Sequence, residues 1–198
     1  MPLWSREKDY NAIIDGMALG YGVPATIIKG VIAKESNFKP DAYRYESRVK
    51  DRTVNGKPAP GPDASRGLMQ VLEFRAREQG FTGPADDLFK PSVNIQHGTI
   101  LLKKNLERAQ GRIDVALSAY NAGWSEQRPN DAKRDERGEI INRDYVERVK
   151  VYAGYFAGKL TAGDVLKIEA GQMATPALVF FWPVSLPGLS SDKGGARD

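Results

Sequence analysis

The chain has 198 residues, a net charge of +4 and no cysteine. A chain of this length buries about two-thirds of its unfolded surface, so its core requires neither a metal nor disulfide bonds. The missing cysteines exclude thiol nucleophiles and thiolate metal sites, and the mild positive charge fits either an ordinary soluble surface or an anionic partner such as a cell-wall polymer.

The N-terminal segment is predicted to form an amphipathic helix over residues 5–19, because apolar residues recur at helical spacing from Tyr10 to Ala18. It has no uninterrupted apolar stretch of the kind that a secretory signal requires. If the substrate lies outside the cytoplasm, the protein needs another route to it. A mature protein whose leader had been removed would have the same sequence.

Glu35 is the most informative residue of the second predicted helix, which begins at Pro24. Ile28, Val31 and Ile32 precede it by seven, four and three residues, so Glu35 shares a face with an apolar stripe. A carboxyl group in apolar surroundings resists ionisation, and a neutral acid near pH 7 can protonate a leaving group. The alternative is a solvent-exposed glutamate at a helix end.

The rest of the chain is predicted to be mainly helical. Residues 41–65 are polar and rich in glycine and proline, and a β-hairpin is predicted over 49–57 around Asn55-Gly56. Further helices are predicted over 68–79, 92–109, 113–122, 144–160 and 161–172. We therefore expect a helical bundle around the helix that bears Glu35, with one domain over 1–160 and a C-terminal extension over 161–198.

The C-terminal extension contains an apolar run over 177–187, including Phe180, Phe181 and Trp182. It is too short to span a bilayer, which takes about 20 apolar residues, and two prolines interrupt it. Packing against the main domain is one interpretation, and contact with a membrane surface or a partner protein is the other. Residues 190–198 are small and polar and are expected to be disordered.

Five short motifs follow one another along the chain, in the order Glu35-Ser36, Gly67-Leu68-Met69-Gln70, Asn94-Ile95 with Gly98, Ala119-Tyr120-Asn121-Ala122-Gly123 and Tyr145-Val146. Together they resemble the lysozyme-like domain of the soluble lytic transglycosylase family, over about residues 10–156. The resemblance implies a mainly α, lysozyme-like α+β fold. It also implies cleavage of the β-1,4 bond between N-acetylmuramic acid and N-acetylglucosamine in peptidoglycan.

The resemblance also assigns roles to matching residues. Glu35 is the single catalytic residue, and the hydroxyls of Ser65 and Tyr145 orient its carboxyl group. The residues expected to line the sugar groove are Met69, Gln70, Tyr120 and Asn121, although Met69 and Tyr120 could instead belong to the core. The family continues the Gln with a Pro and a Thr where this chain has Glu73 and Arg75, which leaves groove shape and substrate preference open.

In this family the glutamic acid protonates the glycosidic oxygen, the substrate N-acetyl group stabilises the sugar cation, and the glutamate then removes the proton of the 6-hydroxyl. The product is a 1,6-anhydro sugar. A muramidase would instead use water and a second carboxylate, for which Glu46, Asp63 and Glu73 are candidates outside the family motifs. A silent glycan-binding or structural virion protein is a further alternative, disfavoured by the presence of both Glu35 and Tyr145.

The expected partner is the peptidoglycan glycan strand, with no nucleic acid, cofactor or metal, and a monomer is expected. His97 has no second histidine or cysteine with which to form a ligand set. The expected site of action is the bacterial cell wall in the periplasm. A phage virion or release from the cytoplasm during lysis would bring the protein there, and residues 177–187 could contact a membrane surface or a virion partner.

Overall fold

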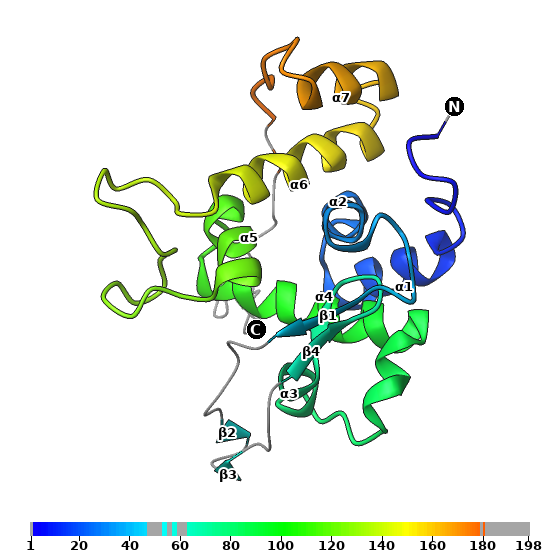
Figure 1. The fold of residues 1–198 in the computed structure, drawn as a ribbon, viewed down its shortest axis with the longest axis vertical. Coiled ribbons are helices and arrows are strands. Elements are labelled where there is room, and N and C mark those ends of the chain that lie inside the picture. The colour runs from blue at the N-terminus through cyan, green and yellow to red at the C-terminus, as the bar shows by residue number, and fades with distance from the viewer. Residues whose placement is uncertain (1, 47–52, 55–56, 59–62, 179, 181–198) are drawn as a thin grey trace, which may run out of the picture.

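The computed structural model describes residues 2–46, 53–54, 57–58, 63–178 and 180. Figure 1 shows helices gathered around α2, with a small sheet along one side. The helices are α1 (Asn11–Tyr21), α2 (Ala25–Ser36), α3 (Glu73–Arg77), α4 (Pro91–Arg108), α5 (Ile113–Ala122), α6 (Arg143–Phe156) and α7 (Ala162–Glu169), with a 3-10 helix η1 (Ala85–Phe89). The mainly helical fold expected from the sequence is confirmed.

Two small antiparallel sheets complete the described fold. The strands are β1 (Tyr43–Glu46), β2 (Thr53–Val54), β3 (Lys57–Pro58), β4 (Asp63–Arg66) and β5 (Val71–Leu72). The order β1-β4-β5 forms one sheet, and β2 pairs with β3 to form the other. The strands of the predicted hairpin are therefore confirmed, while residues 49–52 and 55–56 lie outside the described residues.

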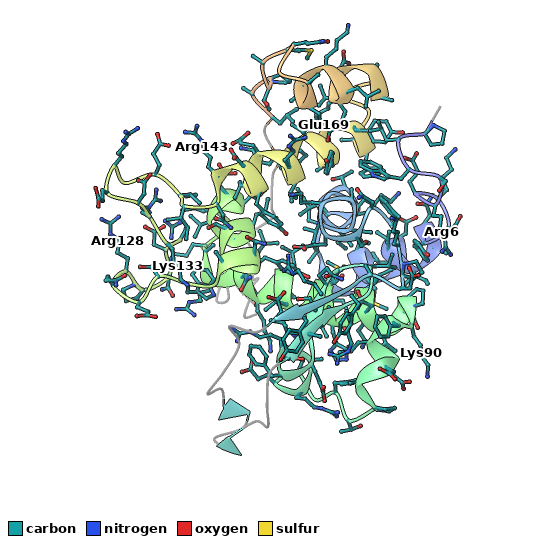
Figure 2. The ribbon with its side chains drawn as sticks, in the orientation of Figure 1. Arg6, Lys90, Arg128, Lys133, Arg143 and Glu169 are labelled. Carbon is teal, nitrogen blue, oxygen red and sulfur yellow. The ribbon has the colours of Figure 1, made fainter. Side chains whose placement is uncertain are left out.

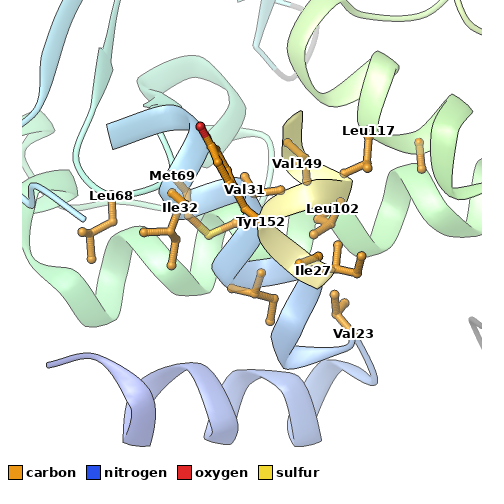
Figure 3. Close-up of a cluster of buried hydrophobic side chains, with 14 of the residues drawn as sticks. Val23, Ile27, Val31, Ile32, Leu68, Met69, Leu102, Leu117, Val149 and Tyr152 are labelled. Carbon is orange, nitrogen blue, oxygen red and sulfur yellow. The ribbon is translucent and has the colours of Figure 1, made fainter. Parts of the chain in front are cut away.

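Helix α2 forms the centre of the core and packs against α6. Its apolar side chains, among them Val31 and Ile32, are fully buried and share a cluster with Val149 of α6 (Figure 3). Gly30 lets the two helices approach closely, because an added Cβ there would lie 2.6 Å from the carbonyl oxygen of Val149. The burial of α2 explains why its sequence is apolar on more than one face.

The helix predicted over 68–79 is wrong in its first half. Gly67 and Gln70 have φ angles of +71° and +49°, which an α-helix does not accept. Residues 67–70 therefore form a turn, Val71 and Leu72 form β5, and the helix spans only Glu73–Arg77. A short apolar run is compatible with a helix or a strand, so the pattern alone did not distinguish them.

The N-terminal helix begins later than predicted, at Asn11. Residues before it form turns that dock on α6 through Trp4, whose ring makes an edge contact with Tyr152 at 4.9 Å and stacks on Phe156 at 5.7 Å. The buried Glu7 carboxylate accepts a hydrogen bond from the Tyr155 hydroxyl at 3.0 Å. Tertiary contacts with α6 therefore order residues 5–10 as turns, although the predicted helix included them.

The C-terminal extension begins with α7, within the predicted range of 161–172. Farther along, Leu178 packs against Gly154 of α6, and the Lys159 ammonium lies 5.2 Å from the centre of the Phe180 ring. The rest of the apolar run, over 181–187, and residues 190–198 lie outside the described residues. Within the described part of the chain, no helix is long and apolar enough to cross a membrane.

Candidate active site

Glu35 is half-buried in the last turn of α2. The Tyr145 hydroxyl donates a hydrogen bond to Glu35 Oε1 over 2.6 Å. Burial raises the pKa of Glu35 above its ordinary value, and this effect outweighs the Tyr145 hydrogen bond and the positive charges of Arg44 and Lys34, which lower it. The carboxyl group therefore holds its proton to higher pH than an exposed glutamate does.

The packing of α6 on α2 explains why Tyr145 meets Glu35 across 110 residues of sequence. Tyr145 lies one turn before Val149, the residue whose carbonyl oxygen rests against Gly30 of α2. Burial raises the pKa of the Tyr145 hydroxyl well above its ordinary value. The hydroxyl therefore stays protonated and acts as a hydrogen-bond donor to Glu35.

Buried polar groups fasten the end of α2 to the turn at residues 67–70. Ser36 Oγ donates to the carbonyl oxygen of Leu68 over 2.8 Å. Asn94, fully buried on α4, donates to the carbonyl oxygens of Arg66 and Leu88 over 2.7 and 2.6 Å, and its Oδ1 accepts from the Met69 amide over 2.7 Å. Asn94 of the Asn-Ile motif therefore holds the turn at residues 67–70 in place, a role that the motif alone does not indicate.

Of the two predictions for Met69, the core prediction holds and the groove prediction is wrong. Its side chain is fully buried within the apolar cluster of Figure 3. An added Cβ at Gly98 of α4 would lie 2.5 Å from the Met69 sulfur atom, so the motif glycine provides the space for it. The backbone of Met69 serves the site instead, because its carbonyl oxygen accepts a hydrogen bond from the Tyr120 hydroxyl over 2.8 Å.

Ser65 does not hydrogen-bond Glu35 as predicted, and this expectation is corrected. Its Oγ donates to Glu46 Oε1 over 2.9 Å, and Arg44 Nε donates to the same oxygen over 2.6 Å. Side chains two apart on a strand share a face, so Arg44 and Glu46 of β1 lie on the side of the sheet that carries Ser65. The negative charge of Glu46 contributes to the raised pKa of Glu35.

The other two candidate carboxylates have structural contacts around α3. Asp63 is buried, and its Oδ2 accepts from the backbone amide of Phe74 in the first turn of α3 over 3.1 Å. Glu73 forms an ion pair with Arg77 over 2.9 Å along the same helix. Glu46 is therefore the candidate whose charge acts on Glu35.

A hollow of about 560 Å³ lies between α3, α4, α5 and the loop that follows α5. Glu35 and Tyr145 are not among its lining residues, and Tyr120, on which the charge of Glu35 acts, connects the hollow to them. Gln70, Tyr120 and Asn121, the residues expected to contact sugars, line it. The Gln70 side-chain nitrogen donates to the carbonyl oxygens of Ala42 and Gly67 over 3.1 and 3.0 Å, so the amide also holds its own turn. Burial and the charge of Glu35 together raise the pKa of the Tyr120 hydroxyl.

Several residues of the site lie outside the sequence motifs. Trp124 and Asn105 line the hollow, and Arg44 lowers the pKa of Glu35. Trp124 directly follows the last predicted motif, which is a signal that could have found it. His97 makes a hydrogen-bonding contact with Gln79 over 3.0 Å, and burial lowers its pKa.

Comparison with known proteins identifies the family. Residues 12–143 match the family model described as the Transglycosylase SLT domain. The chain belongs to this family. The chain is 28% identical over 132 residues to membrane-bound lytic murein transglycosylase C of Actinobacillus pleuropneumoniae serotype 5b (strain L20), covering 60% of this chain and 32% of the relative.

A viral relative and a solved structure extend the comparison. The transglycosylase of Enterobacteria phage PRD1 is 31% identical over 106 residues, covering 54% of this chain and 32% of that protein. The chain thus spans about a third of the length of these curated relatives. Lytic transglycosylase Slt from Pseudomonas aeruginosa, solved as an inactive variant, has a TM-score of 0.54 at 21% identity, covering 82% of this chain and 26% of that one. This likeness confirms the lysozyme-like fold expected for an SLT domain.

Proposed function

We propose that this SLT domain is a peptidoglycan lytic transglycosylase that cleaves the β-1,4 bond between N-acetylmuramic acid and N-acetylglucosamine. The observation that carries the proposal is the pairing of Glu35, whose pKa is raised by burial, with the Tyr145 hydroxyl at 2.6 Å. A general acid works best when it is protonated near the working pH and held in a fixed orientation. Family membership and the names of the curated relatives support the same reaction class.

The reaction begins with transfer of the Glu35 proton to the glycosidic oxygen, which lets the leaving sugar depart as a neutral alcohol. The carbonyl oxygen of the substrate N-acetyl group stabilises the positive charge at the anomeric carbon. The ionised Glu35 then takes the proton of the 6-hydroxyl, and that oxygen bonds to the anomeric carbon. The product carries a 1,6-anhydro ring, no water is consumed, and Glu35 is protonated again.

Neighbouring residues position this acid and the glycan. Tyr145 donates to Glu35 and stabilises its ionised form between the two proton transfers. Ser36 and Asn94 hold the turn that presents Gln70 to the hollow. Gln70, Tyr120 and Asn121 contact the glycan in this proposal, because amides bind sugar hydroxyl and N-acetyl groups and an aromatic ring packs on a sugar face.

Mass spectrometry of the fragments released from purified cell wall tests the proposal. The wild-type protein should release muropeptides that end in 1,6-anhydro-muramic acid. The Glu35→Gln variant should lose about 10²-fold to 10⁴-fold or more of this activity, because the amide keeps the shape but cannot donate the proton. Near-full activity in that variant would refute the assignment of Glu35.

A muramidase is the second candidate, and the position of Glu46 is the observation that favours it. This carboxylate is held by Ser65 and Arg44 and acts electrostatically on Glu35, as the second carboxylate of a hydrolase would. A Glu46→Gln variant separates the two reactions. Reducing-end products together with a severe loss in this variant would establish the hydrolase, whereas anhydro products and a modest loss support the transglycosylase.

We further propose that the protein acts on peptidoglycan strands at the cell wall, which the names of the curated murein transglycosylases support. We also propose that it acts as a monomer. The relative in phage PRD1 supports a viral origin as one route to that substrate. Electron microscopy of purified particles with a labelled antibody against this chain would test the virion assignment, and chromatography coupled to light scattering would test the monomer.

A further inference from the structure

The hollow beside the candidate active site continues beyond the residues proposed to contact the glycan. From Tyr120 and Asn121 it passes Gly123 and reaches Trp124 in the loop between α5 and α6. Lys133 of the same loop lies over this end, with its ammonium 3.9 Å from the place that a Cβ of Gly123 would occupy. Figure 2 shows Lys133 on the loop that projects beside α5. The same hollow thus extends from the Ala-Tyr-Asn-Ala-Gly motif to the loop between α5 and α6, which lies outside the five motifs.

The charged side chains that line this outer part are mostly basic. They are Arg75, Lys104, Arg108 and Lys133, with Glu78 as the acidic member. Glu78 is paired with Arg75 over 3.1 Å. Among the described residues, no carboxylate lies within 4.0 Å of Lys104, Arg108 or Lys133. Three positive charges therefore face the hollow without an ion-pair partner in the described part of the chain.

Asn105 and Trp124 also line this part of the hollow and add a hydrogen-bonding group and an aromatic ring to it. Asn105 of α4 is 5% exposed and lines the hollow, and its side chain makes no hydrogen bond within the described part of the chain. The amide is not among the buried side-chain groups that lack a partner, so it is accessible from the hollow, where a ligand can form hydrogen bonds with it. Arg108 lies over the Trp124 ring at 4.3 Å and donates to Asn130 Oδ1 over 3.0 Å, which fixes its guanidinium group at the rim.

We propose that this basic region, defined by Lys104, Asn105, Arg108, Trp124 and Lys133, binds the carboxylates of the peptide stem on muramic acid. The inference rests on the proposed function, because it names the part of the same substrate that the region recognises. The sugars and their N-acetyl groups are uncharged, and the lactyl carboxyl of muramic acid is used in the bond to the peptide. The stem therefore supplies the anionic groups next to the glycan, and its peptide bonds match the Asn105 amide.

The test compares three substrates. They are peptide-bearing glycan strands, the same strands stripped of peptides by an amidase with the freed lactyl carboxyls then converted to amides, and peptide-bearing strands whose stem carboxylates have been converted to amides. The wild-type protein should prefer the peptide-bearing strands. In the Lys104→Gln, Lys133→Gln double variant, the ratio of kcat/KM for peptide-bearing over stripped strands should fall by about 3-fold to 10-fold, the range for two partly exposed ion pairs. Amidated strands should abolish the difference between wild type and variant.

The matched control is the Lys8→Gln, Lys167→Gln double variant, which changes the charge equally at exposed positions outside the hollow. It should keep the wild-type ratio. The proposal is overturned if the control lowers the ratio as much, if the Lys104 and Lys133 variant keeps it, or if amidated strands are cleaved as well as acidic ones. A general loss on both strands would instead assign these lysines to the glycan.

A binding measurement separates this proposal from the proposed function. If the wild-type protein cleaves none of the strands, the proposed function fails, and calorimetric titration with soluble peptide-bearing glycan fragments still decides the present inference. Binding to the wild type should weaken as salt rises and should be weaker in the Lys104→Gln, Lys133→Gln variant at low salt. Equal binding by both proteins would overturn the stem assignment.

Discussion

Gly30 of α2 lies so close to Val149 of α6 that an added Cβ would stand 2.6 Å from the Val149 carbonyl oxygen. Glycine weakens an isolated helix by about 0.5 to 1 kcal/mol relative to alanine. Here the close crossing that it permits brings Tyr145 to Glu35. A residue with no side chain therefore sets the geometry of the candidate acid.

The Gly30→Ala variant should unfold with a free energy about 1 to 3 kcal/mol below that of the wild type, because backbone atoms of α6 would have to move. Wall cleavage should fall as well, since α6 carries Tyr145. The matched control is Gly16→Ala in the exposed part of α1, where an added Cβ meets nothing within 4 Å. Urea unfolding should show that the control is as stable as the wild type or more stable, and an equal loss in both variants would contradict the packing argument.

The Tyr145→Phe variant should lower turnover by about 10-fold, because Glu35 loses the hydrogen bond that orients it. That hydrogen bond lowers the pKa of Glu35, so its removal raises the pKa further. A general acid is active while protonated. The falling limb of the pH profile of kcat/KM should therefore move to higher pH.

Tyr155→Phe is the control for that pH shift. Tyr155 is on the same helix and donates to the carboxylate of Glu7. Its loss should affect stability and leave the falling limb in place. A Tyr145→Phe profile that keeps its wild-type position would show that the hydroxyl does not act on the ionisation of Glu35.

The Glu35→Gln variant should be more stable than the wild type at pH 7 and equally stable near pH 4. Burial raises the folded-state pKa of Glu35 above the ordinary value of 4.5. The wild type therefore has its full stability below the ordinary pKa and loses part of it as the pH rises through the raised value, by about 1.4 kcal/mol for each unit of elevation. Thermal unfolding of both proteins between pH 4 and pH 7 measures the difference. A difference that stays constant over this range would contradict a raised pKa.

The sequence predicted those features of the fold and site that depend on the local pattern of apolar residues and motifs. The apolar stripe before Glu35 predicted its helix, and of the two positions open to its side chain the structure shows the half-buried one. The motif around Tyr120 indicated a place in a groove or in the core, and its side chain lines the hollow. The spacing of apolar residues does not reveal the positive φ angles of Gly67 and Gln70. The sequence therefore predicts a helix where the structure has a turn followed by β5.

Predictions about side-chain partners were less successful, because partners depend on strand pairing across the sheet. Ser65 meets Glu46 because β4 pairs with β1 in one register, and a short polar strand such as β1 carries little signal for that register. The sequence around Met69 is compatible with a place in the groove or in the core for a similar reason. Only the packing of α4, with Gly98 beneath the sulfur atom, places this side chain in the core.

The start of the C-terminal apolar run should stabilise the domain. Leu178 lies against Gly154 of α6, where an added Cβ would be 3.0 Å from Leu178 Cδ1, and Phe180 is half-buried beside Lys159. Both side chains remain partly exposed, so the Leu178→Ala, Phe180→Ala double variant should lower the free energy of unfolding by about 1 to 3 kcal/mol. Wall cleavage should persist below the unfolding temperature, because neither residue lines the hollow beside Tyr120.

Leu19→Ala is the matched control, because this leucine is 89% exposed on α1. Its effect on stability should stay within about 0.5 kcal/mol. Thermal unfolding and binding to anionic lipid vesicles, measured on the same three proteins, distinguish the two interpretations of the run. A double variant that melts with the wild type but no longer binds vesicles would show that these side chains serve a membrane surface. Lower stability with unchanged vesicle binding would establish that they belong to the domain, since burial against α6 would then account for their apolar character.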